Sequence, residues 1–103
     1  MNFTAWSHDG EWYGFRISKR ERDTYFPHEL KTVILELPYE NKDGLIQIQV
    51  NVSNSFWNKC PELRSSRIRN WFNENGYPPP ATTVPPRFTA EFINKNTLRF
   101  AKN

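Results

Sequence analysis

The sequence predicts an α+β fold that is mainly β: a partly open barrel of about seven strands with two short helices. Segments in which apolar and polar residues alternate recur along the chain, and each has the length of one strand. Only two helical patterns occur, and both are brief. Many short strands expose fewer sheet edges when the sheet curls toward closure, which favours a barrel over an open sheet.

Length and composition limit the possibilities further. The chain has 103 residues, close to a common domain size, so we expect residues 1–103 to form a single domain around one core. Aromatic residues make up 16% of the chain and supply apolar surface for folding, although the mean hydropathy is −0.80. The net charge of +3 favours an anionic partner, but it is too common among proteins to select a function by itself.

Other features of the sequence bear on the compartment. Cys60 is the only cysteine, which excludes a disulfide within the chain, and no apolar run reaches about 18 residues, which predicts no membrane span. The first residues, MNFTAWSHDGEWYG, lack the basic start and the apolar middle of a signal peptide. We therefore expect a protein of the cytoplasm, or nucleoid, that does not bind a membrane.

The first clear strand pattern is followed by a helix. In EWYGFRIS, residues 11–18, Tyr13, Phe15 and Ile17 alternate with more polar neighbours, so they are expected on the buried face. Ser18 and Glu21 have the spacing of a capping box, which predicts a helix over Lys19–Tyr25 that ends at the sequence Phe-Pro.

Two hairpins and a second helix complete the expected fold. The segments KTVILELPY, residues 31–39, and LIQIQVNV, residues 45–52, flank a turn that contains Asp43 and Gly44. Ser66 is expected to cap a helix that ends at Gly76. Residues 77–86, YPPPATTVPP, form a stiff connector. The apolar residues expected in the second helix and in the closing hairpin of residues 87–93 and 97–101 are Ile68, Trp71, Phe72, Phe88, Ala90, Phe92, Leu98 and Phe100.

The segment from Asn54 to Arg69 is the most informative part of the chain, and we expect it to be an irregular basic loop. Its cations are unsuited to a core without partners, because an unpaired buried guanidinium costs several kcal/mol. Arginine suits bidentate binding of phosphate or guanine, and Asn54 and Asn58 are suited to adenine. Alternatively, the loop is solvated and its arginines pair with Glu62. The cations are Lys59, Arg64, Arg67 and Arg69.

A second basic cluster surrounds the first predicted helix. Arg16 and Lys19 lie nearest the end of the strand, and they are candidates for contact with an anion. Lys19, Arg20 and Arg22 have a simpler interpretation as the exposed face of the helix.

The sequence predicts no enzyme and no cofactor. His8, His28 and Cys60 do not have the spacing of a zinc site, and no histidine near Cys60 suggests a base for a nucleophile. The acids Glu36, Glu40 and Asp43 are candidates for a magnesium site, but two of them lie in a predicted turn where acids are common. The four glycines do not form a phosphate-binding loop.

The order of the elements adds a family resemblance. A strand GFRIS, a short helix ending in YFP, a strand pair, a basic segment, a helix with RIRNWF and a closing hairpin together resemble the DNA-binding pseudobarrel of plant B-three transcription-factor domains. The segment NSFWNKCPELRSSRIRNW is more similar to the sequence-reading domains of certain restriction endonucleases that share this fold. The resemblance covers nearly the whole chain.

The resemblance implies sequence-specific binding of double-stranded DNA by two arms that grip the major groove. It assigns an N-arm to residues 7–12 and a C-arm to residues 54–69, and it leaves room for a catalytic partner protein or domain on another chain. The alternative is a small protein-interaction module, an inhibitor or accessory protein that uses exposed Trp6, Trp57 and arginines. The expected DNA contacts are Ser7, His8, Asp9, Gly10, Glu11, Arg16, Lys19, Asn54, Ser55, Trp57, Asn58, Lys59, Arg64, Arg67 and Arg69.

Overall fold

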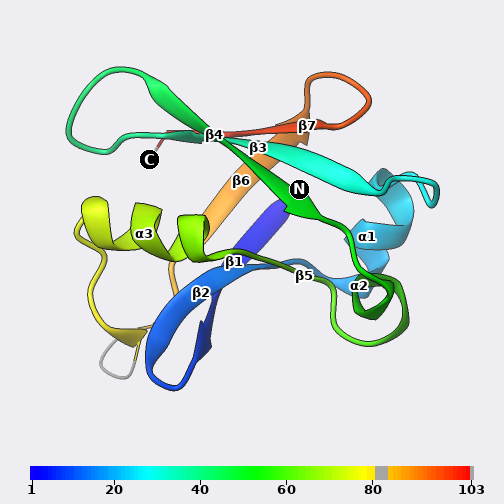
Figure 1. The fold of residues 1–103 in the computed structure, drawn as a ribbon, viewed down its shortest axis with the longest axis horizontal. Helices are drawn as coiled ribbons and strands as arrows, with labels where there is room; N and C mark the ends of the chain where they lie inside the picture. Colours follow the sequence, from blue (N-terminus) through cyan, green and yellow to red (C-terminus); the bar gives the residue numbers. More distant parts are fainter. Residues whose placement is uncertain (81–83, 103) are drawn as a thin grey trace.

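A computed structural model describes residues 1–80 and 84–102, and within them the chain forms seven strands and three short helices (Figure 1). The mainly β fold is therefore confirmed, with one helix more than the sequence predicts. The elements are β1 Asn2–His8, β2 Glu11–Arg16, α1 Lys19–Tyr25, β3 Thr32–Pro38, β4 Leu45–Asn51, α2 Asn54–Asn58, β5 Glu62–Arg64, α3 Ser66–Glu74, β6 Arg87–Phe92 and β7 Thr97–Phe100.

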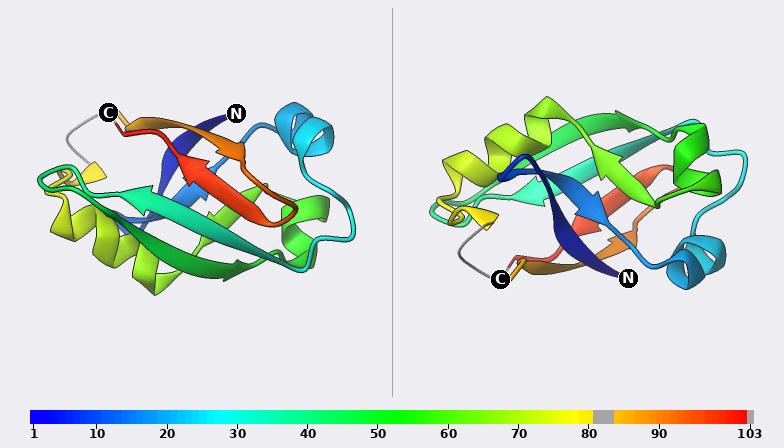
Figure 2. Two further views of the ribbon diagram at one scale, coloured as in Figure 1. Left: turned by 90° about the horizontal axis from the view of Figure 1, so that it is seen from above. Right: turned by 90° about the horizontal axis from the view of Figure 1, so that it is seen from below.

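All seven strands belong to one mixed sheet, in the order β4-β3-β7-β6-β1-β2-β5. Neighbouring strands are antiparallel except β3 and β7, which are parallel. The sheet curls so far that its two ends, β4 and β5, face each other without pairing (Figure 2). The result is a nearly closed barrel with one unsealed seam between β4 and β5.

The barrel interior is largely aromatic. Phe15 lies at its centre, with its ring centroid 4.6 Å from that of Phe100 and 5.4 Å from those of Phe72 and Phe88. Because side chains alternate along each strand, every strand contributes its inward set to this core. Helix α3 adds Ile68, Trp71 and Phe72, the three residues that its spacing predicts to be buried. Of the closing hairpin, Phe92 is only partly buried.

The β1–β2 hairpin departs from the predicted alternation. Its two-residue turn, Asp9-Gly10, has φ values of 52° and 79°, the combination that a type I′ turn requires. The register shifts between Trp6 and Ser7, and Tyr13 stands opposite no residue of β1. Such a β-bulge turns side chains to the other face. Trp12 is therefore buried and Tyr13 half-buried, the reverse of the expected arrangement.

Helix α1 has the predicted bounds, and its cap is half of a capping box. The Ser18 hydroxyl accepts a hydrogen bond from the Glu21 amide at 3.1 Å. The Glu21 carboxylate does not return to Ser18 but accepts from the Asn2 amide of β1 at 3.1 Å. The helix ends at Tyr25, and its C-cap Phe26 lies directly before Pro27, as predicted. The cap thus links α1 to β1.

The prediction of an irregular loop over residues 54–69 is wrong. Phe56 is fully buried and fixes α2, while Leu63 is 1% exposed and fixes β5 against β2. Two apolar anchors therefore order this basic segment. Helix α3 begins one residue earlier than expected, because Ser65, not Ser66, is its N-cap. Gly76 has a φ of 72°, which confirms the left-handed stop.

The predicted stiff connector, residues 77–86, is attached at both ends. The Trp12 indole donates a hydrogen bond to the carbonyl of Pro78, and the Ala5 amide donates to the carbonyl of Pro86 at 2.9 Å. Residues 81–83 of the connector lie outside the described residues. The two attachments place Pro78 and Pro86, near the two ends of the connector, beside the β1–β2 hairpin.

Candidate nucleic-acid interface

The predicted N-arm is the tip of the β1–β2 hairpin. Ser7, His8, Asp9 and Glu11 are all exposed, and the His8 ring and the Asp9 carboxylate lie 3.2 Å apart. Trp12 does not belong to this arm, because its side chain is buried in the barrel. The arm is therefore short, and its two carboxylates give it a negative charge.

The predicted C-arm consists of α2, β5 and the first turn of α3. The side chains of Asn54, Asn58 and Lys59 are exposed, whereas Ser55 is half-buried. Figures 1 and 2 place the β1–β2 turn and α2 toward opposite ends of the molecule, with β5 between them. The β1–β2 turn and α2 therefore flank β5, the strand that carries Arg64.

A single row of residues joins the two arms. Trp6 of β1 pairs with Gly14 of β2, and Gly14 pairs with Arg64 of β5. Gly14 lies between the other two in this row, and the Arg64 guanidinium carbon is 5.6 Å from the centre of the Trp6 ring. The His8 and Tyr13 rings lie 6.0 and 5.3 Å from the Trp6 ring. Arg64 is thus held against an aromatic cluster from the N-arm side.

Two of the predicted DNA contacts, Arg16 and Arg69, are paired with carboxylates. Glu62 accepts from the Arg16 Nε at 3.1 Å, and Glu11 lies 3.6 Å from Arg69. Each of these pairs links the β1–β2 hairpin to the C-arm. The two arginines are therefore less available to an outside anion. The alternative expected the arginines of the segment to pair with Glu62, but Glu62 pairs with Arg16 of β2, and among the segment's arginines it is Arg69 that has a carboxylate partner, Glu11.

Three cations of the C-arm have no carboxylate partner among the described residues. Lys59 and Arg64 are exposed and make no side-chain hydrogen bond there, and Arg67 makes only a long one, 3.5 Å, to the carbonyl of Gln47. Since Glu11 and Glu62 are already paired, these three cations give the interface its surplus positive charge.

The cluster around α1 differs from the prediction at Arg22. Lys19 and Arg20 are exposed as expected, but Arg22 is 7% exposed. Its Nη1 donates to the carbonyls of Phe56 and Trp57, both at 3.0 Å. Arg22 therefore satisfies the end of α2, where carbonyl groups lack partners within the helix. It was missed because a helix-face pattern does not reveal a buried partner far along the chain.

Trp57 is less free than its predicted role requires. Its ring stacks on that of His28 with centroids 4.2 Å apart, and the Arg22 guanidinium lies 5.5 Å from its centre. It is only partly exposed and packs against the core. Trp57 is therefore first an anchor of α2.

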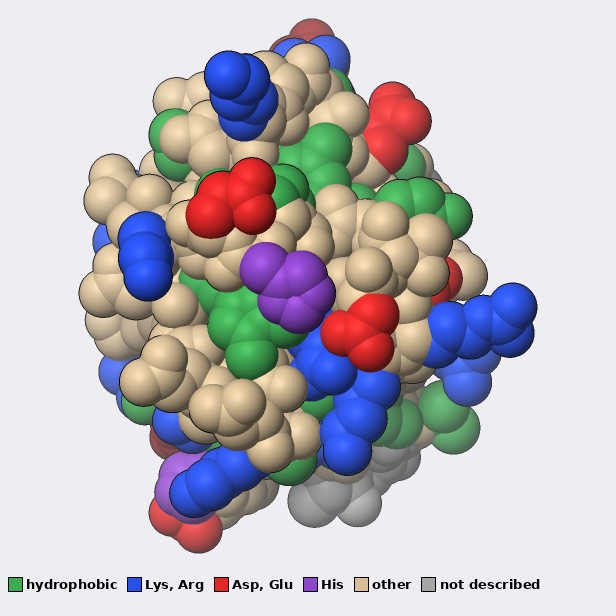
Figure 3. All heavy atoms as spheres, turned by 90° about the vertical axis from the view of Figure 1, so that its right-hand side faces the viewer, with side chains coloured by type: hydrophobic (Ala, Val, Ile, Leu, Met, Phe, Trp, Pro, Cys, Tyr) green, Lys and Arg blue, Asp and Glu red, His purple; other side chains and the backbone are tan. Residues whose placement is uncertain are grey.

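Charges on the end of the molecule that carries α1 and α2 are mixed. Figure 3 shows Lys and Arg side chains spread over this face with Asp and Glu side chains between them, and no continuous basic field. Recognition of an anion at this end would depend on individual side chains.

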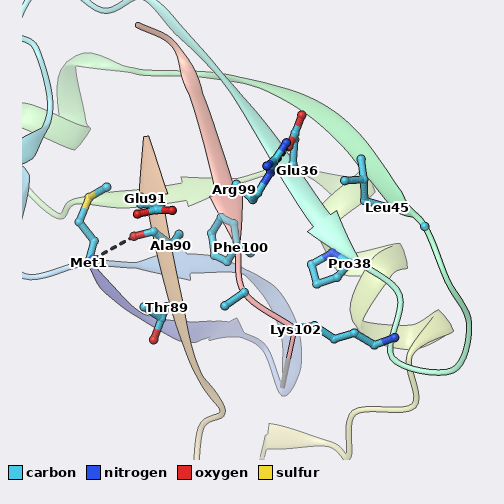
Figure 4. Close-up of a pocket in the computed structure, with 12 residues that line it drawn as sticks. Met1, Glu36, Pro38, Leu45, Thr89, Ala90, Glu91, Arg99, Phe100 and Lys102 are labelled. Carbon is cyan, nitrogen blue, oxygen red and sulfur yellow. Dashed lines mark hydrogen bonds and ion pairs between the residues drawn. The ribbon is translucent and has the colours of Figure 1, made fainter. Parts of the chain in front are cut away.

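A separate hollow of about 580 Å³ lies over β3, β6 and β7 (Figure 4). At its rim the Arg99 Nε donates to the Glu36 carboxylate at 2.8 Å, and Gln47 donates to the second oxygen at the same distance. The hydrogen bond from Arg99 and then that from Gln47 hold the pKa of Glu36 below its ordinary value, against the opposing effect of burial. The polar groups of Glu36 are thus already satisfied.

In residues 1–80 and 84–102, no three His, Cys, Asp or Glu side chains gather as a metal site would require. In the same residues, no helix has the length and apolar character needed to cross a membrane. Cys60 is exposed.

Comparison of the chain with models of protein families, with curated proteins and with solved structures gives no match.

Proposed function

We propose that this protein binds double-stranded DNA in a sequence-specific manner, through the major groove, with β5 and its flanking arms as the contact surface. The observation that carries the proposal is Arg64, which is exposed, held over Trp6 and without an acidic partner among the described residues. A guanidinium that is oriented by an aromatic ring loses less freedom when it binds.

Arg64 is the proposed base-reading residue. The planar fork of arginine matches the O6 and N7 atoms of guanine in the major groove, and one such bidentate pair discriminates against a wrong base by about 1–3 kcal/mol. Arg16 and Arg69 are weaker candidates, since Glu62 and Glu11 occupy them. Lys59, at the end of α2, carries a point charge suited to phosphate.

The DNA sequence that the protein prefers is identified first, by selection of duplexes from a random double-stranded pool. Fluorescence anisotropy then measures the affinity of the protein for cognate and scrambled duplexes. Arg64→Ala is expected to weaken cognate binding by about 1–3 kcal/mol and to relax the preference at one position. Lys59→Ala should weaken all sequences equally and lower the salt slope by about one unit.

Lys95→Ala is the matched control, because Lys95 lies in the β6–β7 turn and its removal changes the net charge equally. It should leave affinity nearly unchanged. A folded Arg64→Ala, Arg67→Ala double variant that keeps full affinity and sequence preference would reject this surface as the reader.

A protein-interaction module is the second candidate, and the aromatic cluster favours it. Trp6, Tyr13 and Arg64 are residue types common at the centres of protein interfaces, and the Trp6 and Tyr13 rings lie 5.3 Å apart in this structure. Salt separates the two candidates. DNA affinity falls steeply as salt rises, because counterions are released on binding, whereas a mainly apolar protein interface changes much less.

A further inference from the structure

The unsealed seam of the barrel contains a polar pocket. β4 and β5 are the two ends of the strand order, and between them lies a cavity of about 400 Å³, which we call the seam pocket. It is lined by eight residues from residues 49–55 and 62–65, and seven of the eight are polar, Val50 being the exception. A gap between two strand edges that served only packing would be filled by apolar side chains.

The lining is rich in uncharged hydrogen-bonding groups. Gln49 and Asn51 supply amides from β4, while Ser53, Ser55 and Ser65 supply hydroxyls from the segments that follow β4 and β5. The hydroxyls of Ser53 and Ser55 lie 2.8 Å apart, so they converge on one place. Hydroxyl and amide groups of this kind make many of the contacts to phosphate oxygens in protein–DNA complexes.

The charge of the pocket also favours an anion. Glu62 is the one acid among the described lining residues, and its side chain is only 10% exposed and paired with Arg16. Arg64 lines the same pocket and has no acidic partner in the described part of the chain. Ser65 is the N-cap of the nine-residue helix α3, so the positive end of the helix dipole lies at the wall.

The same lining argues against a nucleotide base as the occupant. A base that leaves its stack is normally held between aromatic or apolar side chains. Among the residues that the structure describes, no aromatic side chain lines the seam pocket. We propose that the seam pocket binds a phosphodiester group, so that one DNA strand crosses the open seam beside Arg64.

This inference rests on the proposed function. Its test uses the full chain and combines a change in the pocket with a change at one DNA phosphate. Asn51→Ala, Ser55→Ala is expected to lower the affinity for cognate and scrambled duplexes equally, by about tenfold, because neutral donors to a charged group are lost. The salt slope should stay as in the wild type, since no cation is removed. Asn41→Ala, at an exposed turn residue, is the control and should change nothing.

Duplexes with a single neutral methylphosphonate then locate the contact. At one phosphate position this substitution should lower the DNA affinity of the wild type about tenfold and leave the DNA affinity of the pocket variant nearly unchanged. Wild-type affinity in a folded pocket variant would overturn the inference while the proposed function stands. The inference would also be overturned if the pocket variant lost affinity only for duplexes with one particular base pair, because the pocket would then read a base.

Inorganic phosphate separates a DNA phosphate from a free one. Amide NMR shifts of Ser53, Ser55 and Ser65 during a phosphate titration, absent with sodium chloride at the same ionic strength, support a phosphate site in the seam pocket. If the wild type binds no duplex but these shifts occur, the proposed function fails and the pocket takes free phosphate. If neither DNA binding nor shifts occur, both proposals are overturned.

Discussion

At the scale of a single residue, Gly14 sets how closely β2 and β5 approach each other in the candidate interface. A Cβ atom at this position would lie 2.2 Å from the Leu63 carbonyl oxygen and 2.8 Å from the Arg64 Cα atom. Both are backbone atoms, so β5 would have to move rather than a side chain. Gly14 also stands in register between Trp6 of β1 and Arg64 of β5, whose guanidinium carbon lies 5.6 Å from the centre of the Trp6 ring. Gly14 therefore determines where Arg64 stands relative to the N-arm.

Gly14→Ala is expected to destabilise the protein by about 1–3 kcal/mol, the range typical of an overpacked site. Urea denaturation measures this change in the free energy of unfolding. Ser7→Ala, at an exposed position of β1, is the control and should stay within about 0.5 kcal/mol. An unchanged Gly14→Ala variant would mean that β5 is not held against β2 as described.

Individual residues were predicted well where a local pattern decided the outcome. Ser18 caps α1 as expected, and Gly76 ends α3. Tyr13 was assigned to the core because strict alternation was assumed, and a one-residue bulge reversed it. Arg22 was assigned to solvent because its partners lie 34 and 35 residues away. Register shifts and distant hydrogen bonds leave no periodic trace in the sequence.

Helix α2 is held in place by two contacts with the rest of the molecule. It has only five residues, too few to be stable alone, and the buried Phe56 holds one side of it. Arg22 holds its C-terminal end through two carbonyls and binds Asp23 at 2.9 Å. That hydrogen bond and the nearby charge hold the pKa of Asp23 below its ordinary value. Helix α1 therefore positions the C-arm.

Arg22→Met is expected to cost about 1–3 kcal/mol of folding free energy, because two carbonyls at the end of α2 lose their donor. Amide hydrogen exchange in residues 54–59 should quicken more than in α3, because α2 loses its attachment. Arg20→Met is the matched control on the same helix, since Arg20 is exposed. Equal exchange in α2 for both variants would contradict the positioning role.

At the scale of elements, the sequence predicted the strands and helices that have strong periodic patterns. β3, β4, β6 and β7 pair in the expected hairpins. α2 and β5 were missed because each is very short and lies among charged residues. Each of the two has one deeply buried apolar residue, Phe56 or Leu63, and a single apolar residue gives no period to detect.

At the scale of the whole molecule, one sheet supplies both a closed side and an open side. A polar ladder crosses the closed side, since Arg99 of β7 binds Glu36 of β3, which binds Gln47 of β4. Pairing of the parallel strands β3 and β7 brings the first two together. The open side between β4 and β5 carries the seam pocket. The barrel-like closure was predictable from many short strands, but the location of the seam depended on which strands end the sheet.

The ladder gives the whole fold a pH dependence with a definite sign. Because the folded-state pKa of Glu36 is lowered, mainly by Arg99, its stabilising contribution is complete above the unfolded value of about 4.3. It is lost as the pH falls through the lower folded-state pKa. Asp23 acts in the same direction, so some pH dependence should remain when Glu36 is replaced.

Glu36→Gln should therefore destabilise the protein at pH 7 by about 1 kcal/mol, since the Glu36 side chain is 8% exposed but its partner Arg99 is 55% exposed to solvent. The difference from the wild type should shrink as the pH falls below about 4, where the wild-type carboxylate also becomes protonated. Urea denaturation at a series of pH values measures both effects. Glu91→Gln is the control, because exposed Glu91 stands opposite Arg99 on β6 without a side-chain bond in the described residues. A constant difference between Glu36→Gln and wild type across this pH range would show that the ladder acts through packing and not through the charge of Glu36.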